Sequence, residues 1–147
     1  MRNGFSCVGF LFVCAGVGLL SACNKTDALP GTETVKSGSA MYQKITAAQA
    51  KEMMDSGKPF VLLDVRTEAE YAEKRIEGAL LIPDYEISGR AAAELPDTSA
   101  LILVYCRSGR RSASAANELV RMGYTNVYDF GGLSDWPFDT VNGAVPK

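Results

Sequence analysis

Short apolar runs alternate with amphipathic segments over most of the chain after residue 40. Five runs are predicted to be strands: 41–45, 60–63, 79–82, 101–105 and 126–130. These runs are largely continuous instead of alternating with polar residues, which is typical of strands buried on both faces of a parallel sheet. The pattern therefore predicts an α/β domain, an open parallel sheet of about five strands covered by helices on both faces.

The segments between the strands carry helix signals. Thr46 with Gln49, and Thr67 with Glu70, have the spacing of capping boxes, in which a threonine and a Gln or Glu cap each other's backbone at a helix start. Helices are expected at 47–55, 68–74 and 112–122, with a helical stretch within 91–95 and a helical turn at 133–136. In open α/β sheets, ligands bind at the carboxyl ends of the strands, and Asp64 and Cys106 lie at such ends.

The first 40 residues differ from the rest. A basic Arg2 is followed by an apolar stretch at 4–20 and by Leu-Ser-Ala-Cys at 20–23, a sequence typical of a signal peptide and similar to a bacterial lipobox. An uncleaved anchor helix is the alternative, but the stretch is shorter than the roughly 20 residues that span a bilayer. We expect a lipoprotein signal peptide at 1–22 and lipidation of Cys23.

The segment that follows the predicted cleavage site is polar. Residues 23–40 contain Thr, Ser, Gly, Pro and charges of both signs, which favours a flexible, lipid-anchored tether. The folded domain is then expected at 41–147. This organisation predicts a cell-envelope protein, held at the periplasmic face of the outer or inner membrane by the lipid on Cys23.

The composition of the chain excludes several classes of catalytic and metal-binding site. The chain has no histidine, which excludes Ser-His-Asp and Cys-His catalysis and histidine-containing metal sites. The net charge of −2 gives no support for a nucleic-acid partner. Of the four cysteines, Cys7 and Cys14 belong to the predicted signal peptide and Cys23 is the predicted lipid site, so Cys106 is expected to be the free thiol of the mature protein.

The segment 106–112, Cys-Arg-Ser-Gly-Arg-Arg-Ser, is suited to an anion. Gly109 permits a tight turn, successive backbone N–H groups in such a turn form an anion-binding nest, and the following helix contributes its positive N-terminal end. Arg107, Arg110 and Arg111 add positive charge in a geometry that fits oxyanions. Together these features should lower the pKa of the Cys106 thiol and favour the nucleophilic thiolate without an imidazole base.

This segment resembles the active-site loop of rhodanese-type sulfurtransferases, and two further motifs extend the resemblance over about 41–136. The stretch from Asp64 to Tyr71, continuing through Ile76–Ala79 to Pro83, is similar to the N-terminal signature of the family. Gly123, Tyr124, Val127, the segment 131–133 and Trp136 resemble its C-terminal signature. One departure is visible, because Lys74 and Arg75 occupy places where the family usually has Gly-His.

The resemblance implies a two-step transfer without an organic cofactor or a metal. Cys106 thiolate takes the outer sulfur of a small anionic donor such as thiosulfate, and the persulfide passes it to cyanide or to a thiol, including a protein thiol. The implied catalytic residue is Cys106, and the implied donor-binding residues are Arg107, Ser108, Gly109, Arg110 and Arg111. Supporting roles are expected for Asp64, Arg66 and Ser112, the first two through a salt bridge.

Two functions other than catalysed sulfur transfer are compatible with the same loop. Cysteine phosphatases and arsenate reductases have similar loops, but theirs are one residue longer between the cysteine and the arginine, whereas four residues separate Cys106 from Arg111. The second alternative is a tethered persulfide carrier or partner-binding module that forms the persulfide and does not turn over. Of the remaining residues, Glu70 is expected to act as a helix cap and Tyr71 and Trp136 to lie in the core.

Overall fold

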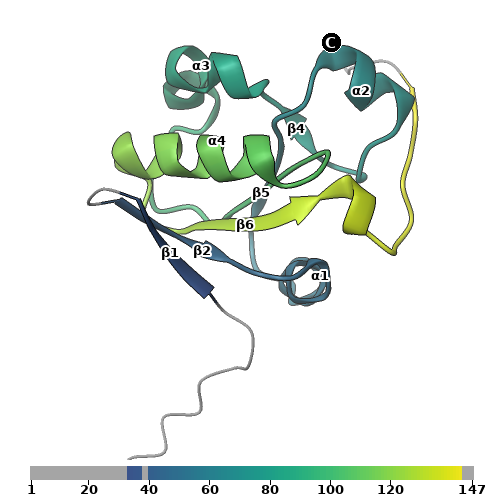
Figure 1. Ribbon diagram of the computed structural model, residues 1–147, viewed down its shortest axis with the longest axis horizontal. Coiled ribbons are helices and arrows are strands. Elements are labelled where there is room, and N and C mark those ends of the chain that lie inside the picture. Colours follow the sequence, from purple (N-terminus) through teal and green to yellow (C-terminus); the bar gives the residue numbers. More distant parts are fainter. Residues whose placement is uncertain (1–32, 38–39, 144–147) are drawn as a thin grey trace, which may run out of the picture.

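The computed structural model describes residues 33–37 and 40–143, and they form one sheet with helices on both faces (Figure 1). The predicted signal peptide and Cys23 lie outside the described residues. The strand order is β1-β2-β6-β5-β3-β4. The strands are β1 (Glu33–Ser37), β2 (Ala40–Lys44), β3 (Val61–Asp64), β4 (Leu80–Leu81), β5 (Ile102–Cys106) and β6 (Val127–Gly132).

The five strands predicted from the sequence are confirmed, and all of them run parallel. In the middle of the sheet, Leu62 of β3 pairs with Leu103 of β5, which in turn pairs with Tyr128 of β6. Strand β5 is buried along its whole length, as its continuous apolar sequence predicts. The carboxyl ends of β3 and β5 therefore lie side by side, and this brings the segment after Asp64 next to Cys106.

Strand β1 is an addition to the predicted sheet. It pairs antiparallel with β2, from Glu33 opposite Lys44 to Ser37 opposite Ala40. These residues fall within the segment 23–40 that was predicted as a flexible tether, so the tether prediction does not hold for 33–37. The physical reason for this strand is backbone pairing. Without β1, the strand β2 would leave one row of backbone N–H and C=O groups unpaired at the sheet edge.

The helices follow the capping signals closely. They are α1 (Ala47–Asp55), α2 (Glu68–Glu73), α3 (Ile87–Glu94) and α4 (Arg110–Arg121), with 3-10 turns η1 (Asp84–Glu86) and η2 (Leu133–Asp135). Both capping boxes are present, at Thr46 with Gln49 and at Thr67 with Glu70. The two predictions therefore placed the starts of α1 and α2 correctly.

Two helices begin earlier than predicted. Helix α3 starts at Ile87 because Ile87 and Ala91, one turn apart, are both buried against the sheet. Arg90 also binds Glu86 and Glu94, each at 2.6 Å, one turn to either side. Helix α4 starts at Arg110 instead of Ser112, since Gly109 takes a left-handed conformation with φ 94° and turns the chain directly into the helix.

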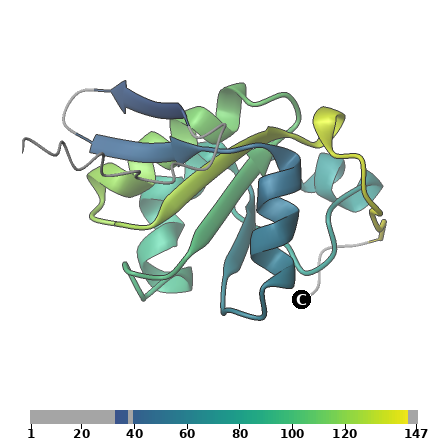
Figure 2. The ribbon, with the colours of Figure 1, turned by 90° about the horizontal axis from the view of Figure 1, so that it is seen from below.

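The helices divide the core into two parts. Helices α3 and α4 cover one face of the sheet and α1 crosses the opposite face (Figures 1 and 2). Under α3 and α4 the buried side chains include Leu63, Val104, Ala116 and Leu119. The other cluster includes Leu62, Leu103, Tyr105, Phe130 and the predicted core residues Tyr71 and Trp136. Within the described parts of the chain, no helix is long and apolar enough to cross a membrane.

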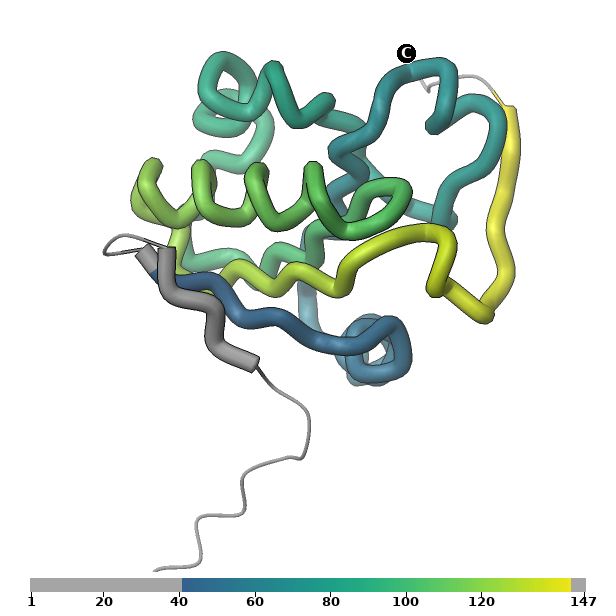
Figure 3. Tube along the Cα trace, in the orientation of Figure 1, coloured from purple at the N-terminus to yellow at the C-terminus, as the bar shows by residue number. Residues whose placement is uncertain are grey.

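The last described segment returns to α2, as the path of the chain in Figure 3 shows. Arg75 and Val141 exchange two backbone hydrogen bonds of 2.8 Å. The Arg75 guanidinium donates to the Gly143 carbonyl at 2.9 Å and lies 4.6 Å from the centre of the Tyr71 ring. The departure from the family pattern at Arg75 therefore has a packing role here, because this arginine fastens the C-terminal segment to α2.

Candidate active site

The loop after β5 folds around the sulfur of Cys106. Cys106 ends the strand, and the left-handed Gly109 brings the chain back so that the Gly109 backbone N–H donates to the Cys106 sulfur at 3.1 Å. The Cys106 residue is only 1% exposed, at the base of the loop. The sequence prediction of a thiol enclosed by a backbone nest matches this geometry.

The loop favours the thiolate. Burial raises the pKa of the Cys106 thiol, but hydrogen bonds from the Ser112 backbone and hydroxyl, and from the backbone of Ser108 and Gly109, lower it further than burial raises it. The net pKa lies below the ordinary value for cysteine. The pKa of the thiol is therefore lowered mainly by hydrogen-bond donors of the loop and of the start of α4. The sequence had predicted that the three arginines would contribute as well.

Ser112 connects the loop to the neighbouring strand. Its side chain is fully buried, and its hydroxyl lies 3.0 Å from the Gly109 carbonyl and 3.2 Å from the Gly131 carbonyl. It therefore lies between the turn that holds the sulfur and the end of β6. The supporting role of Ser112 in the reaction stays a prediction.

The end of β6 packs directly on the loop. A Cβ atom at Gly132 would lie 2.4 Å from the Arg107 carbonyl oxygen and 2.6 Å from the Ser108 Cα, so only glycine fits. The pairing of β5 with β6 shifts register here, between Val104 and Cys106. The Ser134 backbone N–H also donates to the Arg107 carbonyl at 3.1 Å. The backbone at Gly132, part of the segment that resembles the C-terminal signature, therefore packs directly against the cysteine loop.

Asp64 and Arg66 form the predicted salt bridge. The Arg66 guanidinium contacts the Asp64 carboxylate at 2.6 Å and 2.9 Å, and both residues are buried. A further Arg66 N–H donates to the Lys74 carbonyl at 2.6 Å, and the guanidinium lies 5.6 Å from the centre of the Tyr105 ring. The pair thus fixes the segment between β3 and the end of α2 beside the cysteine loop.

Arg111 binds Glu70 with two hydrogen bonds of 2.8 Å. These bonds are the main reason that the pKa of Glu70 falls to about 2. Glu70 is therefore both a helix cap, as predicted, and the partner of the loop arginine. The guanidinium of Arg111 is engaged by a carboxylate, so its predicted contact with an anionic donor stays a prediction.

Arg107 and Arg110 have a different environment. Both residues are exposed, and neither forms a salt bridge with any residue that the structure describes. A hollow of about 260 Å³ beside the loop is lined by Arg107 and Arg66 together with Glu70, Glu73 and Lys74. Arg107 thus carries positive charge to the entrance of the site, where it can attract a small anion.

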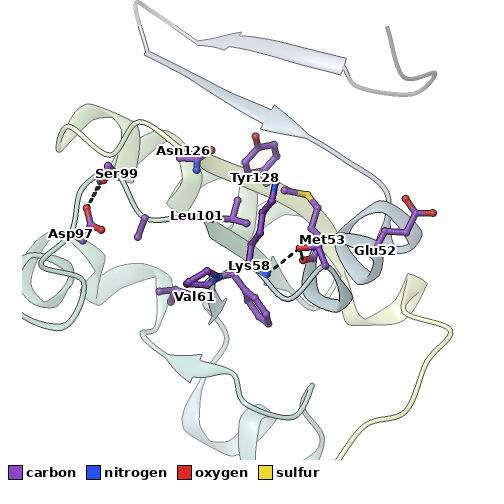
Figure 4. Close-up of a pocket in the computed structure, with 13 residues that line it drawn as sticks. Glu52, Met53, Lys58, Val61, Asp97, Ser99, Leu101, Asn126 and Tyr128 are labelled. Atoms are coloured by element: carbon purple, nitrogen blue, oxygen red, sulfur yellow. Dashed lines mark hydrogen bonds between the residues drawn. The ribbon is translucent and has the colours of Figure 1, made fainter. Parts of the chain in front are cut away.

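A larger hollow lies elsewhere, at the opposite ends of the strands. It measures about 750 Å³, and its lining includes Phe60, Val61, Leu101 and Tyr128 (Figure 4). Leu101 precedes Cys106 by five residues, which corresponds to about 16 Å along a strand. The lining of this hollow contains no cysteine, so we place the reactive centre at the smaller hollow beside the loop.

Asp129, a buried carboxylate within β6, was not among the site residues predicted from the sequence. The residue is 1% exposed, and its Oδ1 accepts the Gly131 backbone N–H at 2.9 Å. Burial raises the pKa of its carboxyl group. A carboxylate in the middle of a run predicted to be a buried strand was the signal that could have identified it.

A cysteine in a short loop at the carboxyl edge of an α/β sheet is the arrangement expected of sulfurtransferase domains and of some cysteine phosphatases, and comparison with known proteins gives the family. The family model described as a rhodanese-like domain matches residues 46–137. The chain belongs to this family.

Its relatives include two single-domain enzymes. Thiosulfate sulfurtransferase PspE of Escherichia coli is 40% identical over 81 residues, which cover 55% of this chain and 78% of the relative. Thiosulfate sulfurtransferase GlpE of Coxiella burnetii is 35% identical over 100 residues, 65% of this chain and 88% of the relative. A solved structure of a rhodanese with anions from E. coli superposes with a TM-score of 0.55 at 38% identity, covering 58% of this chain and all of that one.

Proposed function

We propose that this protein is a sulfurtransferase that moves a sulfane sulfur from thiosulfate, or a similar small anionic donor, through a Cys106 persulfide to a thiophilic acceptor. The observation that carries the proposal is the Cys106 sulfur held by the Gly109 N–H at 3.1 Å within a loop that lowers the pKa of the thiol. The names of the relatives PspE and GlpE support thiosulfate as the donor.

The first step forms the persulfide. The Cys106 thiolate attacks the outer sulfur of thiosulfate, a new S–S bond forms to Cys106, and the S–S bond of thiosulfate breaks. Sulfite leaves with the electron pair of that bond. Arg107 and Arg110 attract the dianionic donor, and the loop N–H groups stabilise the anionic sulfur that remains on Cys106.

The second step returns the enzyme to its starting state. A nucleophilic acceptor such as cyanide attacks the outer sulfur of the persulfide, the new C–S bond yields thiocyanate, and the electron pair of the S–S bond returns to Cys106. The same N–H groups hold the thiolate in both steps, so they stabilise the leaving group here. No histidine is available in this chain for proton transfer, and neither step with cyanide needs one.

Intact mass measures the intermediate directly. Reduced protein incubated with thiosulfate and freed of excess donor should gain the mass of one sulfur atom, and cyanide should remove it. Sulfate, an anion of similar shape with no transferable sulfur, is the matched control and should add nothing. The proposal fails if neither thiosulfate nor a polysulfide donor adds sulfur to a protein whose Cys106 is fully reduced.

We also propose that Cys23 is lipidated and that the lipid holds the domain in the cell envelope, at the periplasmic face of the outer or inner membrane. The support is the sequence itself, an apolar stretch at 4–20 followed by Leu-Ser-Ala-Cys. Anchoring would raise the local concentration of the sulfur carrier near acceptors at the membrane.

Metabolic labelling with a fatty-acid analogue tests the anchor. The full chain and Cys14→Ala should incorporate the label, and Cys23→Ala should not. Cys14→Ala is the matched control because it removes a cysteine from the apolar stretch and leaves the predicted lipid site intact. Equal labelling of all three proteins would contradict lipidation at Cys23.

A further inference from the structure

The ion pair between Arg111 and Glu70 joins the cysteine loop to α2, and the two transfer steps do not use it. The Nη1 and Nη2 atoms of Arg111 donate to separate oxygens of the Glu70 carboxylate, each at 2.8 Å. Arg111 lies in the first turn of α4, and Glu70 lines the hollow of about 260 Å³ beside the loop. An arginine binds a phosphate or a similar oxyanion with the same paired geometry, so the carboxylate occupies the place of such an anion.

The start of α2 holds the Glu70 carboxylate in position. Its Oε2 accepts the Thr67 backbone N–H at 3.2 Å and the Thr67 hydroxyl at 3.1 Å, as part of the capping box. The side chains of Arg111 and Glu70 are only 20% and 22% exposed, so water screens the pair in part. The pKa of Glu70 is about 2, so its carboxylate is ionised at physiological pH. A fixed negative charge therefore holds Arg111 in place.

We propose, resting on the sulfurtransferase function, that Glu70 is a specificity-determining residue that withholds Arg111 from tetrahedral oxyanions such as sulfate and phosphate. With Arg111 engaged, the loop offers such an anion its backbone N–H groups and the exposed Arg107 and Arg110. An inert oxyanion then binds weakly and leaves Cys106 accessible, whereas thiosulfate is captured by the bond that its outer sulfur forms. Donors without oxygen atoms, such as polysulfides, fit the same loop because they too are captured through sulfur.

Glu70→Gln tests the proposal, because it should release Arg111 and leave α2 intact. A glutamine already serves at the same position of the other capping box, where Gln49 accepts from the Thr46 backbone N–H at 2.9 Å. A neutral amide has one acceptor oxygen and no charge, so it cannot hold both Nη atoms of Arg111. Sulfate should therefore bind about tenfold more tightly to this variant, the scale of one hydrogen bond to a charged group. Damage to the fold would not produce a gain of affinity.

The measurement is the protection that sulfate gives to reduced Cys106 against alkylation by iodoacetamide. Peptide mass follows the alkylation of Cys106 at fixed pH, and sodium chloride keeps the ionic strength constant as sulfate is added. The sulfate concentration that halves the alkylation rate should be about tenfold lower for Glu70→Gln than for the wild type. Alkylation does not require sulfur transfer, so failure of the sulfurtransferase proposal is seen separately, as the lack of sulfur gain in the mass experiment.

Two control variants separate the ion pair from the overall charge of the hollow. Glu73→Gln removes an exposed carboxylate from the same hollow and leaves the ion pair intact, so it should change the half-protecting concentration by less than about threefold. Glu70→Gln combined with Arg111→Met removes both members of the pair and keeps their summed charge at zero. This double variant should return the concentration to within about twofold of the wild-type value.

Arg111→Lys gives an independent result if Glu70→Gln does not fold. It keeps a positive charge beside Glu70 and removes the paired Nη donors, so the half-protecting concentration should stay within about twofold of the wild-type value. Binding of sulfate weakened about tenfold would show that Arg111 already binds oxyanions in the wild type, and would overturn the inference. An unchanged concentration or a lack of protection in Glu70→Gln, or an equal gain in Glu73→Gln, would overturn it as well.

Discussion

Cys106→Ser should lower the rate of sulfur transfer from thiosulfate to cyanide by at least about 10³-fold, the scale seen when an enzyme loses its nucleophile. A serine hydroxyl is ionised far less readily than a thiol and cannot form a persulfide. The Gly109 N–H remains to bind an anion, so the loss should appear in kcat and not only in KM. Steady-state thiocyanate formation is the measurement.

Two controls make this result specific. A thermal melt of Cys106→Ser should match the wild type within a few degrees, because the oxygen occupies less space than sulfur in an intact loop. Repeated turnover by the wild type separates an enzyme from a persulfide carrier, which would release one equivalent of thiocyanate and stop. Activity retained in Cys106→Ser would place the nucleophile elsewhere.

Asp64→Ala should lower the free energy of unfolding by about 3–5 kcal/mol, because it leaves the Arg66 guanidinium buried without its counter-charge. Arg66 is 4% exposed and Asp64 is fully buried, so water cannot replace the lost partner. Among the residues that the structure describes, the Lys74 carbonyl would be the remaining acceptor for the guanidinium. Chemical denaturation with the linear extrapolation method measures the change.

The surface of the same molecule supplies a matched control. Lys51 and Asp55 form a salt bridge on α1 with side chains 37% and 61% exposed, and Asp55→Ala should cost about 0.3–0.5 kcal/mol. A double variant, Asp64→Leu with Arg66→Met, removes both charges and should recover much of the stability lost in Asp64→Ala. Equal small losses at the buried and exposed pairs would show that burial of this pair has no energetic consequence.

Local signals account for most of the fold. Capping boxes at Thr46 and Thr67 placed two helix starts, and the run 101–105 gave the central strand, because hydrogen bonds and side-chain burial over a few residues determine these features. Strand β1 was not predicted because its own sequence is polar. It is a strand because its backbone pairs with that of β2 at the edge of the sheet. The start of α4 was misplaced because Gly109 allows the helix to begin at Arg110.

Some features of the candidate site could also be predicted from the sequence, and others could not. The Cys106 loop and the Asp64–Arg66 pair could be predicted because their residues are close in sequence and the types of side chain determine the chemistry. The contacts of Arg111 with Glu70, 41 residues earlier, and of Ser112 with Gly131, 19 residues later, depend on how β3 and β6 align with β5. No short pattern in the sequence encodes such distances.

The loop holds its sulfur mainly through main-chain N–H groups, and main-chain groups are the same whichever side chain a residue carries. Arg107 and Arg110 project outward from this loop and are exposed. We expect their replacement to change which donors and acceptors approach, and the hydrogen bond from Gly109 to the sulfur to remain. The structure thus predicts that substrate choice can change through Arg107 and Arg110 without a change in the main-chain groups that hold the sulfur.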